Sequence, residues 1–397
     1  MAEFRSPYDF IVQCLAASSQ CLAASSGHTT EDLRHDIHDS RLDWEAIIQT
    51  ANAEMVLPAL CARIQDLGLT PDLPADISEF FLGVQELNRE RNQQIISETI
   101  RIARLLNEIG IEPVVLKGAA YLLAGVYKDL SARFIGDLDL LLPASMLTKA
   151  VEVLANDGYV AGEVNFGHHY FPLRRQQEVW VELHHSLGGG TSRSILPAPE
   201  MLKNSISRDF DGARLRVPSP NDLVIHHVLH AQIHQAHSEG IWPTLRTVYD
   251  LVCLQNRFER AIDWTSIAQQ FRVNRREGAL AAHLLLCEEV LGMKKPIPIR
   301  KTVLFQLRWQ HIKMLRRFPA VRRMDPLYLF SRFVITRARR FGNLLRIAAG
   351  RKYLLRTPFR ASFYLHRMHE LLRIFRAATA PPHASERSGA ASEDVNQ

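Results

Sequence analysis

The segment from residue 112 to 187 alternates short β-type runs with helical periods, and this alternation constrains the fold more than any other feature of the chain. The β-type runs are EPVVLK (112–117), DLDLLLP (137–143), HHYFPL (168–173) and EVWVELHHSL (178–187). The segments AAYLLAGVY and ASMLTKAVEVLANDGY, which precede and follow the second run, have a helical pattern. Strands interleaved with helices over so short a stretch predict a small mixed sheet and an α+β fold.

The sequence on both sides of this segment has a helical pattern. From residue 76 to 110 apolar side chains recur three and four residues apart, with Asp76 as the predicted N-cap and Gly110 as the stop. We predict an N-terminal helical region at 1–95, an α/β core at 96–200 and a helical domain at 201–298 that closes a cleft over the core. A basic helical extension follows at 299–378, and a disordered tail at 379–397.

The net charge of +6 conceals a strong asymmetry along the chain. Residues 300–376 carry twenty Lys or Arg and two acids, so the rest of the chain has a balance near −12. Such a basic stretch predicts an anionic partner or a membrane surface, or it is simply the solvated face of helices. No nucleic-acid-binding module accompanies it, so nucleic acid is an unsupported partner.

The cysteines and the hydropathy indicate the compartment. Five cysteines are scattered without a C-x-x-C pair, which is typical of a reducing compartment and argues against a thiolate metal site. No apolar run reaches the roughly 18–20 residues that span a bilayer. We therefore expect a cytoplasmic protein.

Asp137 and Asp139 stand one residue apart at the start of the apolar run DLDLLLP. On a strand, both side chains point to the same face, about 6–7 Å apart along the backbone. Two carboxylates about 4 Å apart repel by about 4 kcal/mol near a protein surface. A fold accepts this repulsion when a cation lies between the groups or when both stay in water, and the spacing alone leaves both explanations open.

The wider pattern resembles a known family. The stretches VVLKG (114–118), RFIGDLDLLLP (133–143) and VELHH (181–185) are similar to those of an uncharacterised bacterial nucleotidyltransferase family within the polymerase-beta-like nucleotidyltransferase superfamily. The similarity covers roughly residues 95–295 and continues through VPSPNDLVIHH and LRTVYDL. It implies a Mg²⁺-dependent enzyme that moves a nucleoside monophosphate from an NTP to a hydroxyl acceptor.

The resemblance also implies roles for individual residues. Two Mg²⁺ ions about 3.5–4 Å apart can stabilise the attacking and leaving oxygens of such a transfer. The implied metal ligands and catalytic residues are Asp137, Asp139 and Glu182, with Glu182 as third carboxylate or general base. The implied nucleotide-binding residues are Lys117, Gly118, Arg133, Gly136 and His184.

One position departs from the superfamily pattern. The first helix usually opens with Gly-Ser, whose hydroxyl holds phosphate, whereas this chain has Gly118-Ala119. Gly118 still allows the backbone to approach an anion closely at the start of a helix. We expect Lys117 or Arg133 to supply the charge that the serine does not.

A histidine stripe lies in the predicted helix after residue 217. His226, His230, His234 and His237 share one helix face, with His227 beside it. The stripe can hold zinc, line the cleft opposite the carboxylates, or be buried between helices without function. No carboxylate or cysteine lies nearby at a ligand spacing, which disfavours zinc. Further along, Arg246 and Asp250 are spaced for an ion pair within one helix.

Two hypotheses follow for the function. The first is the Mg²⁺-dependent nucleotidyltransferase, in which Asp137 and Asp139 hold the metal. The second is a catalytically silent protein of the same fold, which binds an anionic partner or membrane surface through its basic C-terminal helices. The acceptor, the base of the NTP and the oligomeric state cannot be predicted from the sequence.

Overall fold

The computed structural model describes residues 6–17, 29–39, 42–162, 170–176, 179–234 and 244–299, together with 306 and 310. The chain divides into two compact units, Met1–Phe305 and Gln306–Gln397. The described elements all belong to the first unit. The predicted basic extension and tail lie outside the described residues, apart from positions 299, 306 and 310.

The described N-terminal part of the chain is helical. It contains α1 (Pro7–Ala16), α2 (Thr30–His38), α3 (Trp44–Ala53), α4 (Leu57–Asp66), the 3₁₀ turn η1 (Thr70–Asp72) and the long helix α5 (Ala75–Glu108). The predicted N-cap of α5 was wrong, because Pro74 occupies that position and Asp76 lies in the first turn. The predicted stop is confirmed, since Gly110 follows the end of α5 with φ +79°.

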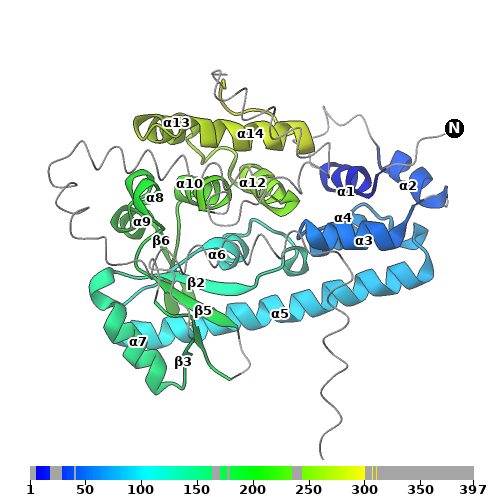
Figure 1. Ribbon diagram of the computed structural model, residues 1–397. Helices are drawn as coiled ribbons and strands as arrows, with labels where there is room; N and C mark the ends of the chain where they lie inside the picture. The colour runs from blue at the N-terminus through cyan, green and yellow to red at the C-terminus, as the bar shows by residue number, and fades with distance from the viewer. Residues whose placement is uncertain are drawn as a thin grey trace, which may run out of the picture. The chain divides into compact units, whose positions relative to one another are not determined.

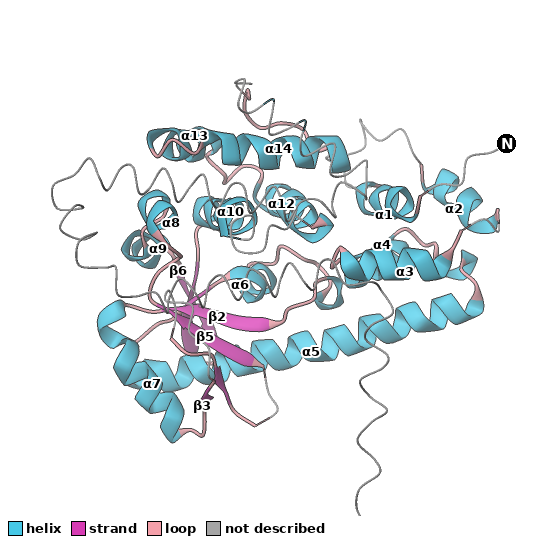
Figure 2. Ribbon diagram, in the orientation of Figure 1, coloured by secondary structure: helices cyan, strands magenta, loops and turns pink. Residues whose placement is uncertain are grey.

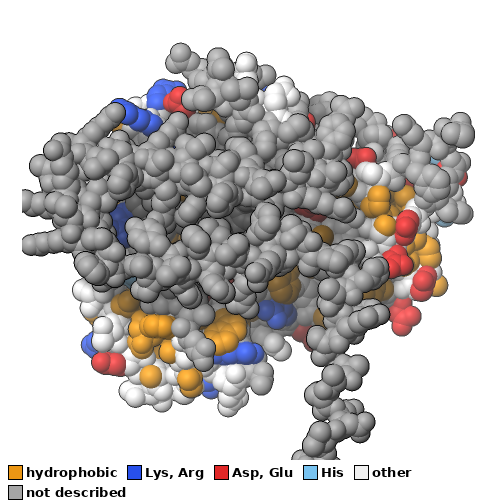
Figure 3. Space-filling model, in the orientation of Figure 1, with side chains coloured by type: hydrophobic (Ala, Val, Ile, Leu, Met, Phe, Trp, Pro, Cys, Tyr) orange, Lys and Arg blue, Asp and Glu red, His pale blue; other side chains and the backbone are white. Residues whose placement is uncertain are grey.

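The surface of these N-terminal helices is acidic. Figure 3 shows Asp and Glu side chains gathered over the edge formed by α2, α3 and the start of α5. Exposed acids on these helices include Glu31, Glu45, Asp76 and Glu79. The negative balance that the sequence assigns to the chain before residue 300 is therefore displayed on the surface of this unit.

The sheet has seven strands in the order β3-β4-β5-β2-β1-β7-β6. The strands are β1 (Val114–Val115), β2 (Asp137–Leu141), β3 (Val160–Ala161), β4 (Leu173–Arg174), β5 (Trp180–His184), β6 (Ile206–Phe210) and β7 (Ala213–Val217). β2 pairs in parallel with β5 and β1 with β7, and the remaining neighbours are antiparallel. The predicted α+β fold with a mixed sheet is confirmed.

The hairpin of β6 and β7 differs from the expectation that 201–298 is helical. The two strands join the sheet beside β1, so the sheet continues past residue 200. Asp211 and Gly212 connect them with φ values of +51° and +78°. Asp-Gly with both residues at positive φ is the turn that favours a two-residue hairpin. This dipeptide was the sequence signal for the hairpin.

Helices cover both faces of the sheet (Figures 1 and 2). α5 runs along one face and packs on β7, and α7 (Leu147–Asn156) packs against α5. On the other side α6 (Lys117–Leu123) lies on β2, followed by a layer of α10 (Pro220–Leu229) and α12 (Leu245–Phe258) and then α13 (Trp264–Val273) and α14 (Glu277–Leu291). The remaining described helical segments are η2 (Leu130–Ala132), η3 (Ala144–Met146), α8 (Gly190–Ile195), α9 (Ala198–Asn204) and the π-helix η4 (His230–His234).

The helices on this side of the sheet differ in how much of their surface is buried. α12 has a polar face and buries Leu245, Val248 and Leu251, whereas α10 and α14 are buried over most of their length. Across the described part of the chain, no helix combines the length and apolar character needed to cross a membrane.

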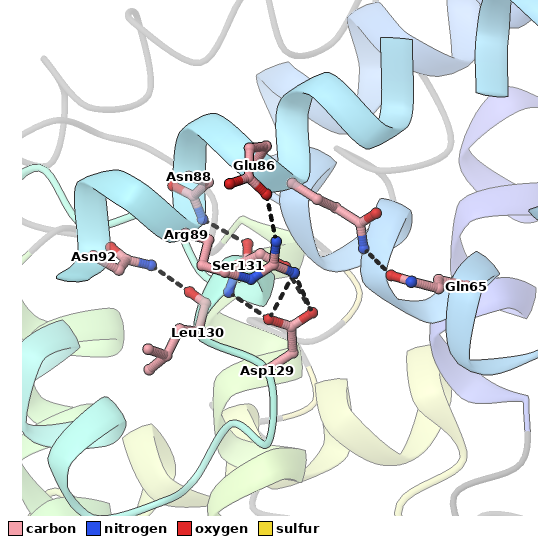
Figure 4. A network of polar contacts seen from close by, with 9 residues as sticks. Gln65, Glu86, Asn88, Arg89, Asn92, Asp129, Leu130 and Ser131 are labelled. Carbon is pink, nitrogen blue, oxygen red and sulfur yellow. Dashed lines mark hydrogen bonds and ion pairs between the residues drawn. The ribbon is translucent and has the colours of Figure 1, made fainter. Parts of the chain in front are cut away.

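Polar side chains of α5 hold the loop that leads into β2 (Figure 4). The Asn88 Nδ2 donates to the carbonyl of Ser131 at 2.6 Å. The Asn92 Nδ2 donates to the carbonyls of Leu130 at 2.5 Å and of Arg133 at 2.8 Å. Buried backbone carbonyls need such partners, because an unsatisfied one costs free energy. These asparagines therefore fix the loop 129–136 before β2 begins.

We expect Asn92→Ala to lower the free energy of unfolding by about 2–4 kcal/mol, because the buried carbonyl of Arg133 and the half-buried carbonyl of Leu130 lose their donor. Asn88→Ala removes the donor of one carbonyl and should cost about 1–2 kcal/mol. Arg89→Ala, on the next residue, breaks ion pairs with Glu86 and Asp129 at the surface and should cost under about 1 kcal/mol. Urea denaturation of the three variants measures this order, and equal losses for Asn92 and Arg89 would contradict it.

Candidate active site

The parallel pairing of β2 with β5 brings the acidic residues together. Asp139 lies opposite Glu182 in the register, and Asp137 lies opposite Trp180. Side chains alternate along a strand, so Asp137 and Asp139 share one sheet face with Glu182 and His184. The prediction that the two aspartates occupy one face of a strand is confirmed.

Asp139 is the centre of a buried charge cluster. Its side chain is 1% exposed, and its Oδ1 accepts a hydrogen bond from the Lys117 Nζ at 2.5 Å. The His184 Nε2 lies 2.7 Å from the same oxygen and 3.3 Å from the Glu182 Oε2. The Lys117 Nζ lies 4.0 Å from that Glu182 oxygen. Two acids thus share one lysine and one histidine.

The pKa values of the two aspartates move in opposite directions. Burial alone would raise the pKa of Asp139, but the charge of Lys117 and the hydrogen bond with His184 hold it well below its usual range. The pKa of Asp137 is raised to about 6, first by the charge of Asp139 and then by burial. Asp139 therefore stays ionised, and its negative charge makes ionisation of the neighbouring Asp137 less favourable.

Three of these side chains form a possible metal site. The ligand atoms of Asp139, Glu182 and His184 all lie within 4.8 Å of one another. Carboxylate oxygens suit Mg²⁺, and an imidazole adds a donor that transition metals prefer. Of the predicted set, Asp139 and Glu182 belong to this compact group, and its third member is His184 in place of Asp137. Asp137 lies on the same strand face, two residues before Asp139.

His184, which the resemblance assigns to nucleotide binding, lies beside the carboxylates of Asp139 and Glu182. It is 3% exposed, and its Nε2 faces both carboxylates. Burial would lower its pKa, but the hydrogen bonds to Asp139 and Glu182 outweigh burial and raise it. This position suits a side chain that orients the carboxylates.

Lys117 reaches the cluster through a strained backbone. It is the first residue of α6 and adopts φ +48°, which non-glycine residues rarely do and which costs about 1–3 kcal/mol. Burial would lower its pKa, but the charges of Asp139 and Asp137 outweigh burial and raise it. Its ammonium provides the positive charge that faces the buried Asp139 carboxylate.

A cavity of about 240 Å³ opens beside the cluster. Lys117 belongs both to its wall and to the charge cluster, and Asp137 joins the wall from the same strand face as Asp139. The wall combines α6 and the loop before β2 with the helices α10 and α12 on the opposite side. Its lining residues are Lys117, Gly118, Tyr121, Arg133, Phe134, Ile135, Gly136, Asp137, His226, His227, His230, Arg246, Thr247 and Asp250.

Arg133 lies in this cavity wall, and its guanidinium group is bound to Asp250 of α12. Its Nε and Nη2 donate to the two carboxylate oxygens of Asp250 at 2.9 Å and 3.0 Å. Its guanidinium carbon lies 5.1 Å from the ring centroid of Tyr121. The expected ion pair of Arg246 with Asp250 is therefore wrong, because Arg133, 117 residues earlier in the chain, holds both carboxylate oxygens. The Tyr127 hydroxyl also donates to Asp250, at 2.5 Å.

Gly118 and Gly136 differ in what surrounds them. A Cβ on Gly118 would lie 2.3 Å from the Arg133 Nη1, so the absence of a side chain makes room for this guanidinium. A Cβ on Gly136 would have its nearest heavy atom, in Phe134, at 3.8 Å. Packing against Arg133 therefore explains why position 118 is a glycine. At Gly136 no side chain lies so close, and this part of the cavity wall has more room.

A comparison with protein families identifies the family of this chain. A family model described as uncharacterised nucleotidyltransferase matches residues 40–292, which is more than half of the chain. The chain belongs to this nucleotidyltransferase family. No protein with a curated description matches the chain.

Among solved structures, the chain is similar to the crystal structure of an antigenic nucleotidyltransferase-like protein from Paracoccidioides brasiliensis. The two are 15% identical, with 50% of this chain and 97% of that chain covered, and the TM-score is 0.32.

The histidine stripe of this nucleotidyltransferase family member lies partly at the cavity. His226 and His230 line it together with His227, while His237 and the side chain of His234 lie outside the described residues. His227 faces the Tyr121 hydroxyl at 2.9 Å through Nδ1, and the Thr247 carbonyl at 2.8 Å through Nε2. The π-helix begins at His230, and such segments occur frequently at functional sites.

His283, which is not part of the stripe, lies against His227 and was not predicted from the sequence. The His283 Nε2 of α14 is 3.1 Å from the His227 Nε2, and the Gln232 Nε2 lies 3.0 Å from its Nδ1. His283 is fully buried. Burial and then the charge of His227 lower its pKa to about 3. No local pattern could reveal this pair, because the two residues are 56 positions apart.

This pair predicts a loss of stability in acid. Because the folded-state pKa of His283 lies below its unfolded value, the unfolded chain gains protons first as the pH falls from about 6.5 towards 3. Each pH unit in that window costs about 1.4 kcal/mol of unfolding free energy for this one group. We expect His283→Gln to make the difference in stability between pH 7 and pH 5 smaller by about 2 kcal/mol. Urea denaturation at both pH values measures it, and an unchanged difference would show that His283 takes up its proton in the folded protein.

Proposed function

We propose that this chain transfers a nucleoside monophosphate from an NTP to a hydroxyl-bearing acceptor, as a Mg²⁺-dependent transferase of the 2.7.7 type. The observation that carries the proposal is the convergence of Asp137, Asp139 and Glu182 on one sheet face beside a cavity with cationic side chains. Membership of a nucleotidyltransferase family supports the same reaction class. Asp139 and Glu182 are the principal metal ligands in this proposal, with Asp137 as a further carboxylate at the cavity.

In the proposed reaction, the acceptor oxygen attacks the α-phosphorus, and the bond from that phosphorus to the bridging oxygen of pyrophosphate breaks. The proton of the acceptor passes to a carboxylate, for which Glu182 is the candidate. Bound Mg²⁺ supplies charge stabilisation for the phosphate oxygens. His184 keeps the Asp139 and Glu182 carboxylates in place through its Nε2, and Lys117 limits their repulsion.

The cavity wall gives the nucleotide its place in this proposal. Gly136 and Asp137 form the part of the wall next to the acids, and Lys117 and Gly118 form the start of α6. We place the α-phosphate near Asp137, because this side chain belongs to both the cavity and the acidic strand face. The sugar and base then extend towards the helical side of the cavity.

A thermal-shift titration with ATP, GTP, CTP and UTP, with and without Mg²⁺, tests the proposal on the full chain. A nucleotide at about 100 times its dissociation constant adds about 2.7 kcal/mol to stability, which raises the melting temperature by a few degrees. A shift that requires Mg²⁺ supports the proposal and identifies the preferred base. The absence of a shift with all four nucleotides would contradict it and favour the hypothesis of a catalytically silent binding protein.

A further inference from the structure

Among the described residues, the cavity wall holds one arginine that forms no ion pair with a carboxylate of the wall, although Asp250 and Asp137 act on its charge from a distance. Three cationic side chains line it, of which Lys117 is bonded to Asp139 and Arg133 to Asp250. The third is Arg246, the second residue of α12. Asp250 cannot serve both arginines equally, since its two oxygens already accept from Arg133 and Tyr127.

The hydrogen bonding of Arg246 is incomplete among the residues that the structure describes. Its Nε is buried and has no partner there. A buried donor of a charged group that lacks an acceptor is costly, and native proteins rarely leave one without a reason. Burial, followed by the charge of Arg133, lowers the pKa of Arg246. An anion bound at this point of the wall would give the Arg246 Nε the acceptor that it lacks.

The backbone of Arg246 is fixed by the N-terminal helices. Its amide donates to the carbonyl of Glu54 at 3.2 Å, and the amide of Leu245 donates to the Glu54 carboxylate at 2.8 Å. The start of α12 is therefore held against the end of α3. An arginine on a fixed backbone presents a planar fork of donors, which matches the oxygens of a phosphate better than a lysine does.

We propose that Arg246 binds the phosphate chain of the nucleotide from the helical side of the cavity, across from the acidic strand face. This inference rests on the proposed function, since it assigns a residue to the triphosphate of that reaction. It also reassigns the role first given to Arg133, which is a structural link to Asp250. The phosphate oxygens supply the acceptor that the Arg246 Nε lacks, while metal and Lys117 meet the phosphates at the strand side.

Binding of inorganic tripolyphosphate to the full chain without metal tests this inference, measured by titration calorimetry. We expect Arg246→Gln to weaken the affinity by about 10- to 100-fold, the range for a hydrogen bond between charged groups. Arg246→Lys should recover part of the loss. Arg260→Gln, which removes the same charge from an exposed position just after α12, should leave the affinity unchanged.

The inference is overturned if Arg246→Gln binds tripolyphosphate as tightly as the wild type does, if both Gln variants lose affinity equally, or if the wild type does not bind it. A purely structural arginine would lower the melting temperature when replaced, whereas we expect Arg246→Gln to melt no lower than the wild type. The proposed function fails separately, when the wild type shows no Mg²⁺-dependent binding of an NTP even though tripolyphosphate binding depends on Arg246.

Discussion

Asp139→Asn and Asp137→Asn are expected to remove the same function while changing stability in opposite directions. Both variants should weaken Mg²⁺-dependent NTP binding by more than about 100-fold, because each removes a charge that the proposed metal site needs. Thermal-shift and calorimetric titrations with the preferred NTP, with and without Mg²⁺, measure this effect.

The stability effects differ because the two carboxylates have different partners. Asp139 neutralises Lys117 and His184 in a buried cluster, so its loss leaves uncompensated charge and should cost about 3–5 kcal/mol. Asp137 is repelled by Asp139, which raises the pKa of Asp137 to about 6. At pH 8, where Asp137 is ionised, its neutralisation should stabilise the metal-free protein by about 1–3 kcal/mol.

Urea denaturation at pH 8 in the presence of a chelator distinguishes these effects. A gain for Asp137→Asn together with a loss for Asp139→Asn would show that the fold tolerates the first aspartate for the sake of a cation. If Asp137→Asn destabilised the protein, the aspartate would be a structural residue with an unseen partner, and the metal proposal would lose its electrostatic basis. Glu152→Gln, an exposed charge change on α7, is the matched control for both variants.

The strand-level features of the site were predictable because they depend on local pattern. The run that begins at Asp137 is solidly apolar and ends at Pro143, so a strand with both aspartates on one face follows directly. The Lys117-Gly118 and Glu182 motifs then carried the family resemblance. The alternation of side chains along a strand and the family motifs each extend over only a few neighbouring residues, so both can be recognised in the sequence.

The features that the sequence did not reveal depend on partners far apart in the chain. The spacing of Arg246 and Asp250 suited a helix ion pair, yet a bidentate arginine from a loop 117 residues earlier outcompeted it. A helix ion pair stabilises by a few tenths of a kcal/mol, whereas a buried bidentate pair is much stronger. Likewise, Gly118 suggested an anion site, but part of its explanation is the room it gives to Arg133.

The link between Arg133 and Asp250 should be as costly to break as the buried cluster around Asp139. Arg133 is 9% exposed and Asp250 is 2% exposed. Burial raises the pKa of Asp250, but Arg133 outweighs it and lowers the pKa to about 2, so the pair is ionised at neutral pH. Removal of one partner leaves a buried charge alone. We therefore expect Arg133→Met or Asp250→Leu to cost about 3–5 kcal/mol each.

A double-mutant cycle separates this structural role from ligand binding. Arg133→Met/Asp250→Leu leaves no buried charge behind, so its loss of unfolding free energy should be smaller than the sum of the single losses by about 1–3 kcal/mol. Urea denaturation of the wild type and the three variants gives the coupling. If Arg133→Met kept the stability of the wild type and abolished tripolyphosphate binding, Arg133 would be the phosphate ligand. If the coupling is strong and the double variant still binds tripolyphosphate, Arg133 has a structural role in the cavity wall. Phosphate binding then belongs to Arg246.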